Sequence, residues 1–455
     1  MKNLSISLLN VKDISKYLKR LKEIEQDLEN TKIKKHFDIS IHFDVMDNKF
    51  VPNTGIDISK IDEVNKFNYY IDTHLMVENP IYDKYIEDTI NMECLDITIH
   101  YEINNFEKVL DYLYERKKSL NGNLKIGVAL KPKTDISVIE KYIKKIDKVL
   151  VMSVEPGFGG QKFMQSQIEK IIKLKEKYKD ITIQVDGGIN SDTIAQVIRA
   201  GADSFVIGSY LTKNEDELKD KIDILNIILD IETTPKEADL DFERRTIQAV
   251  DGGYAQGDIL LGIRVLRLRK LAKLWYNIVS LNTLKYFISS NIHDYRRFAI
   301  FCLVNKINAN NKDEIKKFID ENIQYINNWD LVDSVAPICI GKQLILNDDE
   351  YIYNVLRKYT ISDNVWQKRM GIVSLLYLAK LNRKECVFKV LDDVFFEEYH
   401  LYQKATGWVL RELYKVNPKD TLMYLVTKSK MGKIPSILKS YATEKMSIKE
   451  KSLLK

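Results

Sequence analysis

Four side chains in the first half of the sequence are of the types that bind a divalent metal ion. They lie at the ends of three short apolar runs and are His42, Asp44, His74 and Asp186. His42 and Asp44 are two residues apart, so on a β-strand they point to the same side. Two imidazoles and two carboxylates suit zinc, iron(II), manganese or cobalt better than calcium or magnesium. The sequence therefore predicts a site for one divalent transition metal ion.

The two carboxylates of this set could also transfer protons. A cation beside a ketone stabilises the negative charge that develops when a neighbouring proton is removed. Inversion of that carbon needs one group that takes the proton and a second that returns a proton from the opposite face. Asp44 and Asp186 come from runs far apart in the sequence, and we expect them on opposite sides of the site. They are the candidate acid and base.

Glycine-containing segments follow three later apolar runs and could bind a phosphate. Glycine allows backbone N–H groups to approach an anion closely. The candidate phosphate-binding residues are Gly157, Gly159, Gly160, Gly187, Gly188, Gly208 and Ser209. Together with the metal set, these segments predict a phosphorylated ketose as the substrate.

Eight β-rich runs in the first half must position these side chains. The runs are 4–9, 40–46, 70–76, 96–101, 125–130, 148–153, 182–186 and 204–207, and amphipathic segments such as 166–178 and 191–200 lie between them. Strands that alternate with helices predict a parallel sheet, and eight repeats predict an α/β fold, the TIM (β/α)8 barrel. Functional groups of such barrels lie at the C-terminal ends of the strands, where the metal candidates fall.

After about residue 243 the strand signals nearly disappear. Helical patterns separated by short polar turns dominate, and examples are 315–319, 350–359, 365–381 and 403–414. Successive helices without strands favour an all-α solenoid. A chain of 455 residues also exceeds the size of one hydrophobic core. We therefore expect a barrel over 1–228, a linker over 229–242 and a solenoid over 243–455.

The two halves differ in charge. Residues 1–230 contain 34 basic and 38 acidic side chains, whereas residues 231–455 contain 36 and 27, together with all four tryptophans. A basic, tryptophan-bearing half favours a polyanionic partner, and the alternative is an ordinary lysine-rich surface. The sequence has no apolar run of bilayer length and no signal-peptide pattern, so we expect a cytoplasmic protein with no membrane association.

The motifs of the first half resemble those of the ribulose-phosphate 3-epimerase family. The matching segments are His42–Asp47, Phe50–Asn53, His74–Pro80, Met152–Gln161 and Val185–Asn190. The resemblance implies conversion of D-ribulose 5-phosphate to D-xylulose 5-phosphate, with the four metal candidates as ligands and the two aspartates as acid and base. It also implies a substrate site lined by Ser7, Met46, His74, Met76 and Met152.

Some positions depart from the family pattern. Asn10, Val11 and Lys12 stand where Ser-Ala-Asp is usual, Asn48 replaces a glycine, and Lys131 replaces an asparagine. Epimerases that act on allulose 6-phosphate share much of the pattern, so that substrate stays open. A barrel that has lost catalysis is the remaining alternative. Barrels of this family often associate, and a homo-oligomer is a further expectation.

The second half resembles the HEAT-like repeat DNA glycosylases of the alkylation-repair family. The matching segments are Gly257–Arg264, Leu268–Lys270, His293–Arg297, Asn328–Asp333, Trp366–Arg369 and Gln403–Glu412, with Leu266 in place of a frequent proline. By resemblance, Trp329, Asp333 and Trp408 surround a damaged nucleotide in double-stranded DNA, and Arg369 holds a backbone phosphate.

Asp333 is the candidate catalytic residue of this second activity. A purine alkylated at N3 or N7 is cationic and leaves readily, and a nearby carboxylate can stabilise the oxocarbenium-like sugar and place a water molecule. The reading that stays open is an epimerase with a non-catalytic solenoid that binds nucleic acid or acts as a scaffold.

Overall fold

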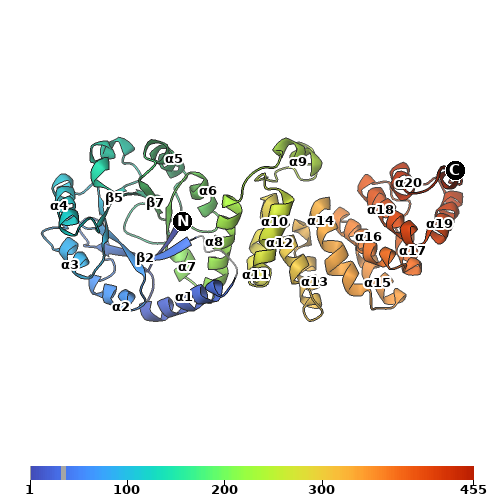
Figure 1. Cartoon of the computed structure of the whole chain (residues 1–455), viewed down its shortest axis with the longest axis horizontal. Helices are drawn as coiled ribbons and strands as arrows, with labels where there is room; N and C mark the ends of the chain where they lie inside the picture. The colour runs from blue at the N-terminus through green and yellow to red at the C-terminus, as the bar shows by residue number, and fades with distance from the viewer. Residues whose placement is uncertain (1, 32–36, 455) are drawn as a thin grey trace. The chain divides into compact units, whose positions relative to one another are not determined.

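The computed structural model describes residues 2–31 and 37–454, and the chain divides into two compact units between Thr233 and Thr234 (Figure 1). Residues 229–233, which we assigned to the linker, extend helix α8 (Leu218–Thr233), because Leu229 and Ile231 are fully buried on it. Helix α9 (Leu240–Thr246) begins within the expected linker, where the Asp239 side chain caps it. The connection between the two helices is therefore shorter than predicted.

The first unit is a closed barrel of eight parallel strands in sequential order, as predicted. The strands are β1 (Lys2–Ser7), β2 (Phe37–Met46), β3 (Tyr70–Met76), β4 (Asp96–His100), β5 (Lys125–Leu130), β6 (Lys148–Met152), β7 (Thr182–Asp186) and β8 (Ser204–Ile207). The connecting helices include α1 (Ile14–Glu29), α2 (Ile61–Asn65), α3 (Tyr85–Asn91), α4 (Phe106–Ser119), α5 (Gln167–Lys177), α6 (Ile194–Arg199) and α7 (Ser209–Thr212).

The first two strands start earlier than the sequence patterns indicated. β1 and β2 pair from Lys2 with Phe37 onward. β1 also ends at Ser7, two residues before the predicted end, because the chain turns there. The Leu9 N–H donates to the Ser7 hydroxyl, and the Val11 N–H donates to the Leu8 carbonyl. This turn leaves Ser7 at the C-terminal end of its strand.

A layer of buried polar side chains crosses the barrel near the first residues of β4 and β6. Lys148 Nζ lies 2.6 Å from an Asp72 oxygen and 2.7 Å from an Asp96 oxygen, and Lys148 is only 5% exposed. Buried charges require such pairing, because an unpaired one would retain its full desolvation cost. Asp72 also contacts His42, so this layer supports the site above it.

The second unit consists of helices, as predicted. Its main helices are α10 (Val265–Trp275), α11 (Leu281–Ile288), α12 (His293–Lys306), α13 (Lys312–Glu321), α14 (Trp329–Val335), α15 (Asp349–Thr360), α16 (Val365–Lys380), α17 (Lys384–Asp392), α18 (His400–Val416), α19 (Pro418–Met431) and α20 (Ser436–Ala442). The even-numbered helices from α10 to α20 pack each against the next, which is the arrangement of a HEAT-like solenoid.

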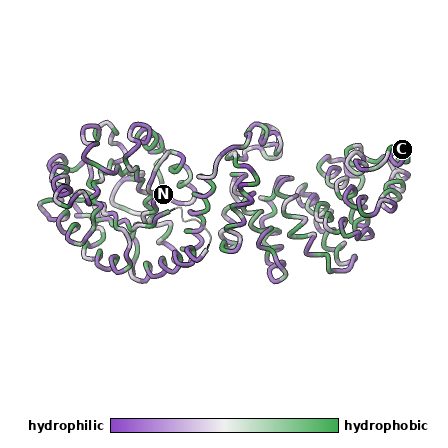
Figure 2. The backbone as a smooth tube through the Cα atoms, viewed as in Figure 1, coloured by the Kyte–Doolittle hydropathy of each residue, from purple (hydrophilic) through white to green (hydrophobic). Residues whose placement is uncertain are grey.

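The helices of the second unit are mostly amphipathic. Figure 2 shows hydrophobic and hydrophilic residues alternating along their turns, and the buried residues recur at helical spacing. α12 and α16 are exceptions, since they are buried almost all round between neighbouring helices. Across residues 2–31 and 37–454, no helix has both the length and the apolar character that a bilayer crossing requires.

Candidate metal centre and candidate nucleic-acid pocket

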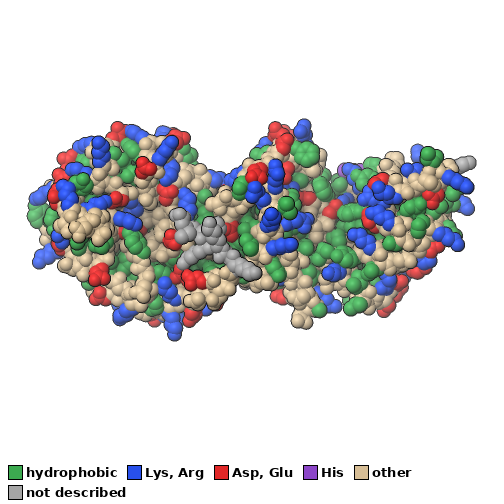
Figure 3. Space-filling model, viewed as in Figure 1, with side chains coloured by type: hydrophobic (Ala, Val, Ile, Leu, Met, Phe, Trp, Pro, Cys, Tyr) green, Lys and Arg blue, Asp and Glu red, His purple; other side chains and the backbone are tan. Residues whose placement is uncertain are grey.

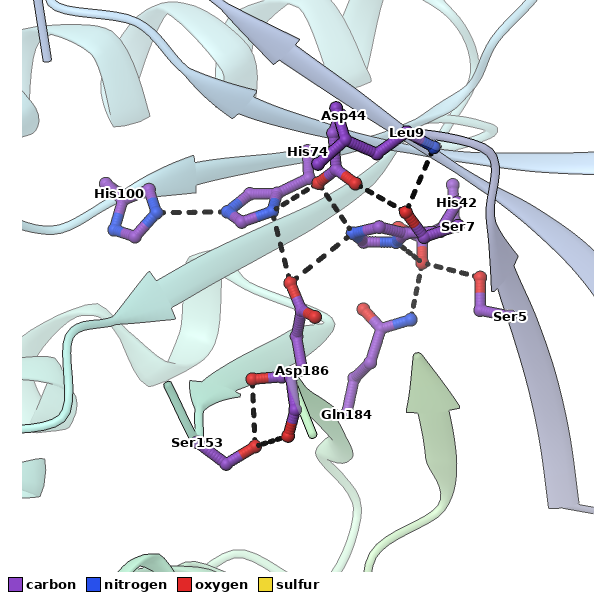
Figure 4. A network of polar contacts seen from close by, with 12 residues as sticks. Ser5, Ser7, Leu9, His42, Asp44, His74, His100, Ser153, Gln184 and Asp186 are labelled. Carbon is purple, nitrogen blue, oxygen red and sulfur yellow. Dashed lines mark hydrogen bonds and ion pairs between the residues drawn. The ribbon is translucent and has the colours of Figure 1, made fainter. Parts of the chain in front are cut away.

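The four predicted metal ligands lie together at the C-terminal end of the barrel. His42 and Asp44 come from β2, His74 from β3 and Asp186 from β7 (Figure 4). One ligand atom from each residue lies within 4.8 Å of all the others. Asp44 Oδ1 is 3.4 Å from His42 Nε2 and 3.3 Å from His74 Nδ1. Ligands around a tetrahedral ion with bonds of about 2.1 Å are separated by about 3.4 Å, so the spacing fits a transition metal.

The hydrogen bonding of the two imidazoles supports the same conclusion. His42 Nε2 and His74 Nδ1 are both buried, and neither has a hydrogen-bond partner among the described residues. Such an unpaired buried nitrogen is costly unless a ligand satisfies it. Both nitrogens point toward Asp44 and Asp186 (Figure 4). The residues present therefore fit a bound cation.

Further polar groups hold the ligands in place. His42 Nδ1 lies 2.9 Å from Asp72 Oδ2, and the Ser7 hydroxyl donates to Asp44 Oδ2 over 2.8 Å. A ligand imidazole is commonly fixed by a carboxylate on its other nitrogen. Ser7 was predicted to line the substrate site, and here it also fixes one of the metal candidates. Asp72 lies two residues before His74 on β3, and the sequence analysis assigned no role to it.

The two candidate acid/base groups have different proton affinities. Burial raises the pKa of Asp186 to about 7, with Asp44 adding to the rise and His42 opposing it. Burial acts in the same direction on Asp44, but His42 and His74 outweigh it and hold the pKa of Asp44 well below its usual range. Two carboxyl groups with separated pKa values can hold one proton between them near neutral pH, which acid/base chemistry requires.

A pocket of about 930 Å³ opens beside the metal candidates. The predicted substrate residue His74 is fully buried and does not line the pocket. All the other residues predicted to bind the substrate or its phosphate do line it: Ser7, Met46, Met76, Met152, Gly157, Gly159, Gly160, Gly187, Gly188, Gly208 and Ser209. The pocket also contains residues that the sequence did not single out, among them Tyr210, Lys213 and Lys221. No motif marked these residues: Tyr210 lies on α7, Lys213 follows that helix, and Lys221 lies on α8.

Two of the pocket glycines are required by the backbone. Gly187 has φ +112° and Gly188 has φ +69°, values that favour glycine. A Cβ atom on Gly188 would lie 2.4 Å from the Phe163 backbone nitrogen, and one on Gly187 would lie 2.1 Å from a Val154 methyl carbon. The loop after β7 can therefore pack against the loop after β6 only with glycine at both positions.

Behind His74 lie two further residues, His100 and Glu102. His100 ends β4 and is fully buried, and Glu102 follows it by two residues. Burial lowers the pKa of His100 to about 4. Burial opposes ionisation of Glu102 too, but hydrogen bonds from His100 and Thr134 outweigh it and lower the pKa of Glu102 to about 2. The sequence analysis assigned no role to either residue.

In the second unit, Asp333 and Arg369 form a bidentate ion pair. Arg369 Nε lies 2.9 Å from Asp333 Oδ1, Nη2 lies 2.7 Å from Oδ2, and Nη1 donates to the Leu401 carbonyl over 2.6 Å. The guanidinium that we assigned to a DNA phosphate thus binds the candidate catalytic carboxylate. Burial raises the pKa of Asp333 against the opposing effect of Arg369.

These residues line a second pocket, of about 740 Å³, that also contains the predicted tryptophans. Trp329 and Asp333 lie one turn apart on α14, Arg369 lies on α16 and Trp408 on α18. The pocket also contains Lys404 and Arg411 of the segment Gln403–Glu412, and four residues that the sequence did not identify: Tyr254, Tyr399, His400 and Tyr441. Tyr254 comes from a segment before α10, about 75 residues before Trp329, so no local spacing marked it.

The charge of the surface is mixed. Figure 3 shows basic side chains over the visible face of both units, interspersed with acidic ones. Within the second unit many basic groups are paired, for example Arg383 with Asp349 and Arg411 with Glu444. Part of the positive charge of residues 231–455 is therefore neutralised by acidic neighbours.

Both units match models of known protein families. Residues 12–212 match the ribulose-phosphate 3-epimerase family, and residues 243–446 match the DNA alkylation repair enzyme family. Ribulose-phosphate 3-epimerase from Aquifex aeolicus is 41% identical over 182 residues, which cover 39% of this chain and 78% of the relative. The Bacillus subtilis enzyme of the same name is 37% identical over 186 residues, covering 39% and 82%.

Solved structures also resemble parts of the chain. One is a predicted DNA alkylation repair enzyme from Enterococcus faecalis, with 16% identity and a TM-score of 0.37, covering 48% of this chain and all of that one. The identity and coverage of the epimerases, together with the barrel and its His and Asp cluster, assign the first unit. Through that unit the chain belongs to the ribulose-phosphate 3-epimerase family, and its second unit matches the DNA alkylation repair enzyme family.

Proposed function

We propose that the first unit epimerises D-ribulose 5-phosphate to D-xylulose 5-phosphate at a divalent metal held by His42, Asp44, His74 and Asp186. The observation that carries this proposal is the convergence of four ligand atoms beside a pocket that Asp44, Asp186 and several glycines line. The relatives named above are ribulose-phosphate 3-epimerases. When bound, the cation supplies positive charge beside the carbonyl oxygen of the ketose.

In this proposal the two aspartates exchange protons with opposite faces of C3. One carboxylate takes the C3 proton, and the C–H electron pair moves into the enediolate. The other carboxyl delivers its proton to the opposite face of C3, which regenerates the ketone with inverted configuration. One carboxyl must begin ionised and the other protonated, so that a single proton is shared between the two aspartates.

The test is epimerisation of D-ribulose 5-phosphate by the full chain loaded with Co²⁺ or Zn²⁺. Asp44→Asn and Asp186→Asn are expected to lower kcat by about 100-fold or more, because each removes one proton carrier. Asp111→Asn is the matched control, since Asp111 is an exposed carboxylate paired with Lys145 outside the pocket. Activity retained in either site variant would refute the two-base mechanism. Turnover of allulose 6-phosphate alone would reassign the substrate.

We further propose that the second unit binds double-stranded DNA and excises purines alkylated at N3 or N7. Asp333 stabilises the sugar as the base departs, and Trp329 and Trp408 contact the damaged nucleotide. Support comes from the match to the DNA alkylation repair enzyme family and from the pocket that these residues line. In this proposal Arg369 orients the Asp333 carboxylate, in agreement with its bidentate pairing.

This second activity is tested by release of alkylpurine from duplex DNA. Asp333→Asn is expected to lower excision by about 100-fold or more, with DNA binding retained. Asp349→Asn is the matched control, because Asp349 also pairs with an arginine, Arg383, but does not line the pocket. DNA binding without excision by the parent chain would instead favour the non-catalytic solenoid.

A further inference from the structure

Three side chains form a continuous hydrogen-bonded line away from the candidate metal centre. His74 Nε2 lies 3.0 Å from His100 Nε2, and His100 Nδ1 lies 3.0 Å from Glu102 Oε2. Both imidazoles are fully buried, and their rings are stacked with centroids 5.0 Å apart. Figure 4 shows His100 on the far side of His74 from Asp44 and Asp186. The line therefore joins Glu102 to a metal candidate through two rings.

The chemistry of the groups fixes the direction of both hydrogen bonds. An ionised carboxylate only accepts, so His100 must donate to Glu102 from Nδ1. A neutral His100 then has a bare Nε2, which accepts the hydrogen of His74 Nε2. His74 in that tautomer has a lone pair on Nδ1, the atom that lies 3.3 Å from Asp44 Oδ1 and has no hydrogen-bond partner among the residues described. The carboxylate of Glu102 thus determines which nitrogen of His74 can bind a cation.

We propose that His100 and Glu102 are positioning residues that hold His74 in the Nε2–H tautomer, with its Nδ1 lone pair directed at the metal. The inference rests on the proposed metal-dependent function of the barrel. It extends the ligand support by one imidazole beyond the usual arrangement, in which a carboxylate contacts the ligand histidine directly. His42 has that direct arrangement through Asp72.

Glu102 is itself held in a way that leaves one oxygen for His100. Its Oε1 accepts from the Lys131 N–H over 2.8 Å and from the Thr134 hydroxyl. On the other side, the Phe50 ring packs against His100 with centroids 4.7 Å apart. Two donors therefore occupy Oε1, and Oε2 faces the imidazole. This arrangement directs Oε2 of Glu102 into the hydrogen-bonded line of Glu102, His100 and His74, which we call the relay.

The arrangement also predicts an unusual effect of Glu102→Gln. The amide oxygen of the variant is expected at the Oε1 position, because two donors point there, and the amide NH₂ then faces His100 Nδ1. His100 Nδ1 can only accept a hydrogen bond from that NH₂ group, so the ring hydrogen of His100 moves to Nε2. There it would face the hydrogen on His74 Nε2, and two N–H groups cannot hydrogen-bond to each other. His74 must then carry its hydrogen on Nδ1, which blocks the ligand atom.

The experiment has two readouts on the full chain. Selective ¹⁵N labelling of its six histidines reports tautomers by NMR, and competition with a chelator reports affinity for Co²⁺. In the parent we expect His74 as Nε2–H and His100 as Nδ1–H. Glu102→Gln is expected to shift His100 to Nε2–H, and both Glu102→Gln and His100→Phe are expected to weaken Co²⁺ binding by about 10–100-fold. Glu115→Gln is the matched control, because Glu115 is an exposed glutamate paired with Lys118 away from the pocket, and it is expected to change Co²⁺ affinity less than about threefold.

The opposite results overturn the inference. His100 as Nε2–H in the parent refutes it without any variant, and so does Co²⁺ affinity unchanged in both relay variants. Failure of the proposed function gives a different pattern. A parent chain with these tautomers that binds Co²⁺ tightly but does not epimerise any ketose phosphate would refute the epimerase proposal and leave the positioning role intact.

Discussion

Replacement of Lys148 by methionine tests whether the buried polar layer holds the barrel together. Methionine has a similar length but no charge, so the variant leaves two buried carboxylates, Asp72 and Asp96, without their cation. Removing one partner of a buried ion pair costs about 3–5 kcal/mol. Asp72 keeps hydrogen bonds from Ser5 and Gln184, and Asp96 keeps one from the Tyr70 hydroxyl. We therefore expect Lys148→Met to lower the free energy of unfolding by about 3 kcal/mol, the lower end of that range.

The destabilisation should depend on pH in a defined direction. In the parent, burial opposes ionisation of Asp72, but Lys148 and His42 outweigh it and hold the pKa of Asp72 well below its usual range. Ionised Asp72 stabilises the fold at pH values above the pKa that this residue has in the unfolded chain. The stabilisation is lost as the pH falls through the lower pKa of Asp72 in the folded state. In the variant the unpaired buried carboxylates have raised pKa values and take up protons as the pH falls. The difference between variant and parent should therefore be larger at pH 7 than at pH 5.

The distribution of tryptophans provides an internal control for this measurement. All four tryptophans lie in the second unit, so tryptophan fluorescence reports unfolding of that unit, whereas circular dichroism reports both. Lys148→Met should lower the melting temperature of the barrel by roughly 6–12 °C, because a unit of this size loses about 2–4 °C per kcal/mol. The fluorescence transition should not move.

A matched surface variant completes the design. Lys145→Met removes a half-buried surface lysine that pairs with the exposed Asp111, and such surface pairs contribute about 0–1 kcal/mol. A loss below about 1 kcal/mol for Lys148→Met, or a loss that does not change between pH 5 and pH 7, would show that the buried charge layer does not stabilise the barrel in the way argued.

Three further predictions concern the two sites. Gly188→Ala should raise KM for the ketose phosphate, because its Cβ would meet the Phe163 backbone at 2.4 Å; steady-state kinetics check this, and an unchanged KM would contradict it. Co²⁺ at 100 times its Kd should stabilise the first unit by about 2.7 kcal/mol without moving the fluorescence transition, and a chelator should reverse the effect. Trp408→Ala should cost about 1–3 kcal/mol in binding of alkylated DNA relative to unmodified DNA, measured by anisotropy; equal losses for both would argue against contact with the lesion.

The order of the elements was accessible from the sequence because local patterns encode it. The strands β3, β5, β7 and β8 begin and end where the apolar runs do, since their ends coincide with polar or turn residues. β2 begins three residues before its predicted start, at Phe37, because pairing with β1 extends it, and no local pattern carries that information. Helix α8 likewise continues past the predicted linker boundary, since packing and not composition decides where it ends.

The site was predictable in its ligands and less so in their surroundings. His42, Asp44, His74 and Asp186 follow from strand ends and motifs, because strand alternation fixes which side each faces. The tertiary structure alone decided the neighbours of those groups. It placed Arg369 on Asp333, although Arg369 had been assigned to a phosphate, because α14 and α16 pack against each other.

The tertiary structure also placed Glu102 next to His100, and His100 next to His74. The hydrogen bonds among these three side chains depend on contacts between strands. The sequence by itself determined which chemical groups are present and in which order the strands bring them to one end of the barrel. Which hydrogen bond each group makes was decided only by packing, because a donor and its acceptor are commonly tens of residues apart in the chain.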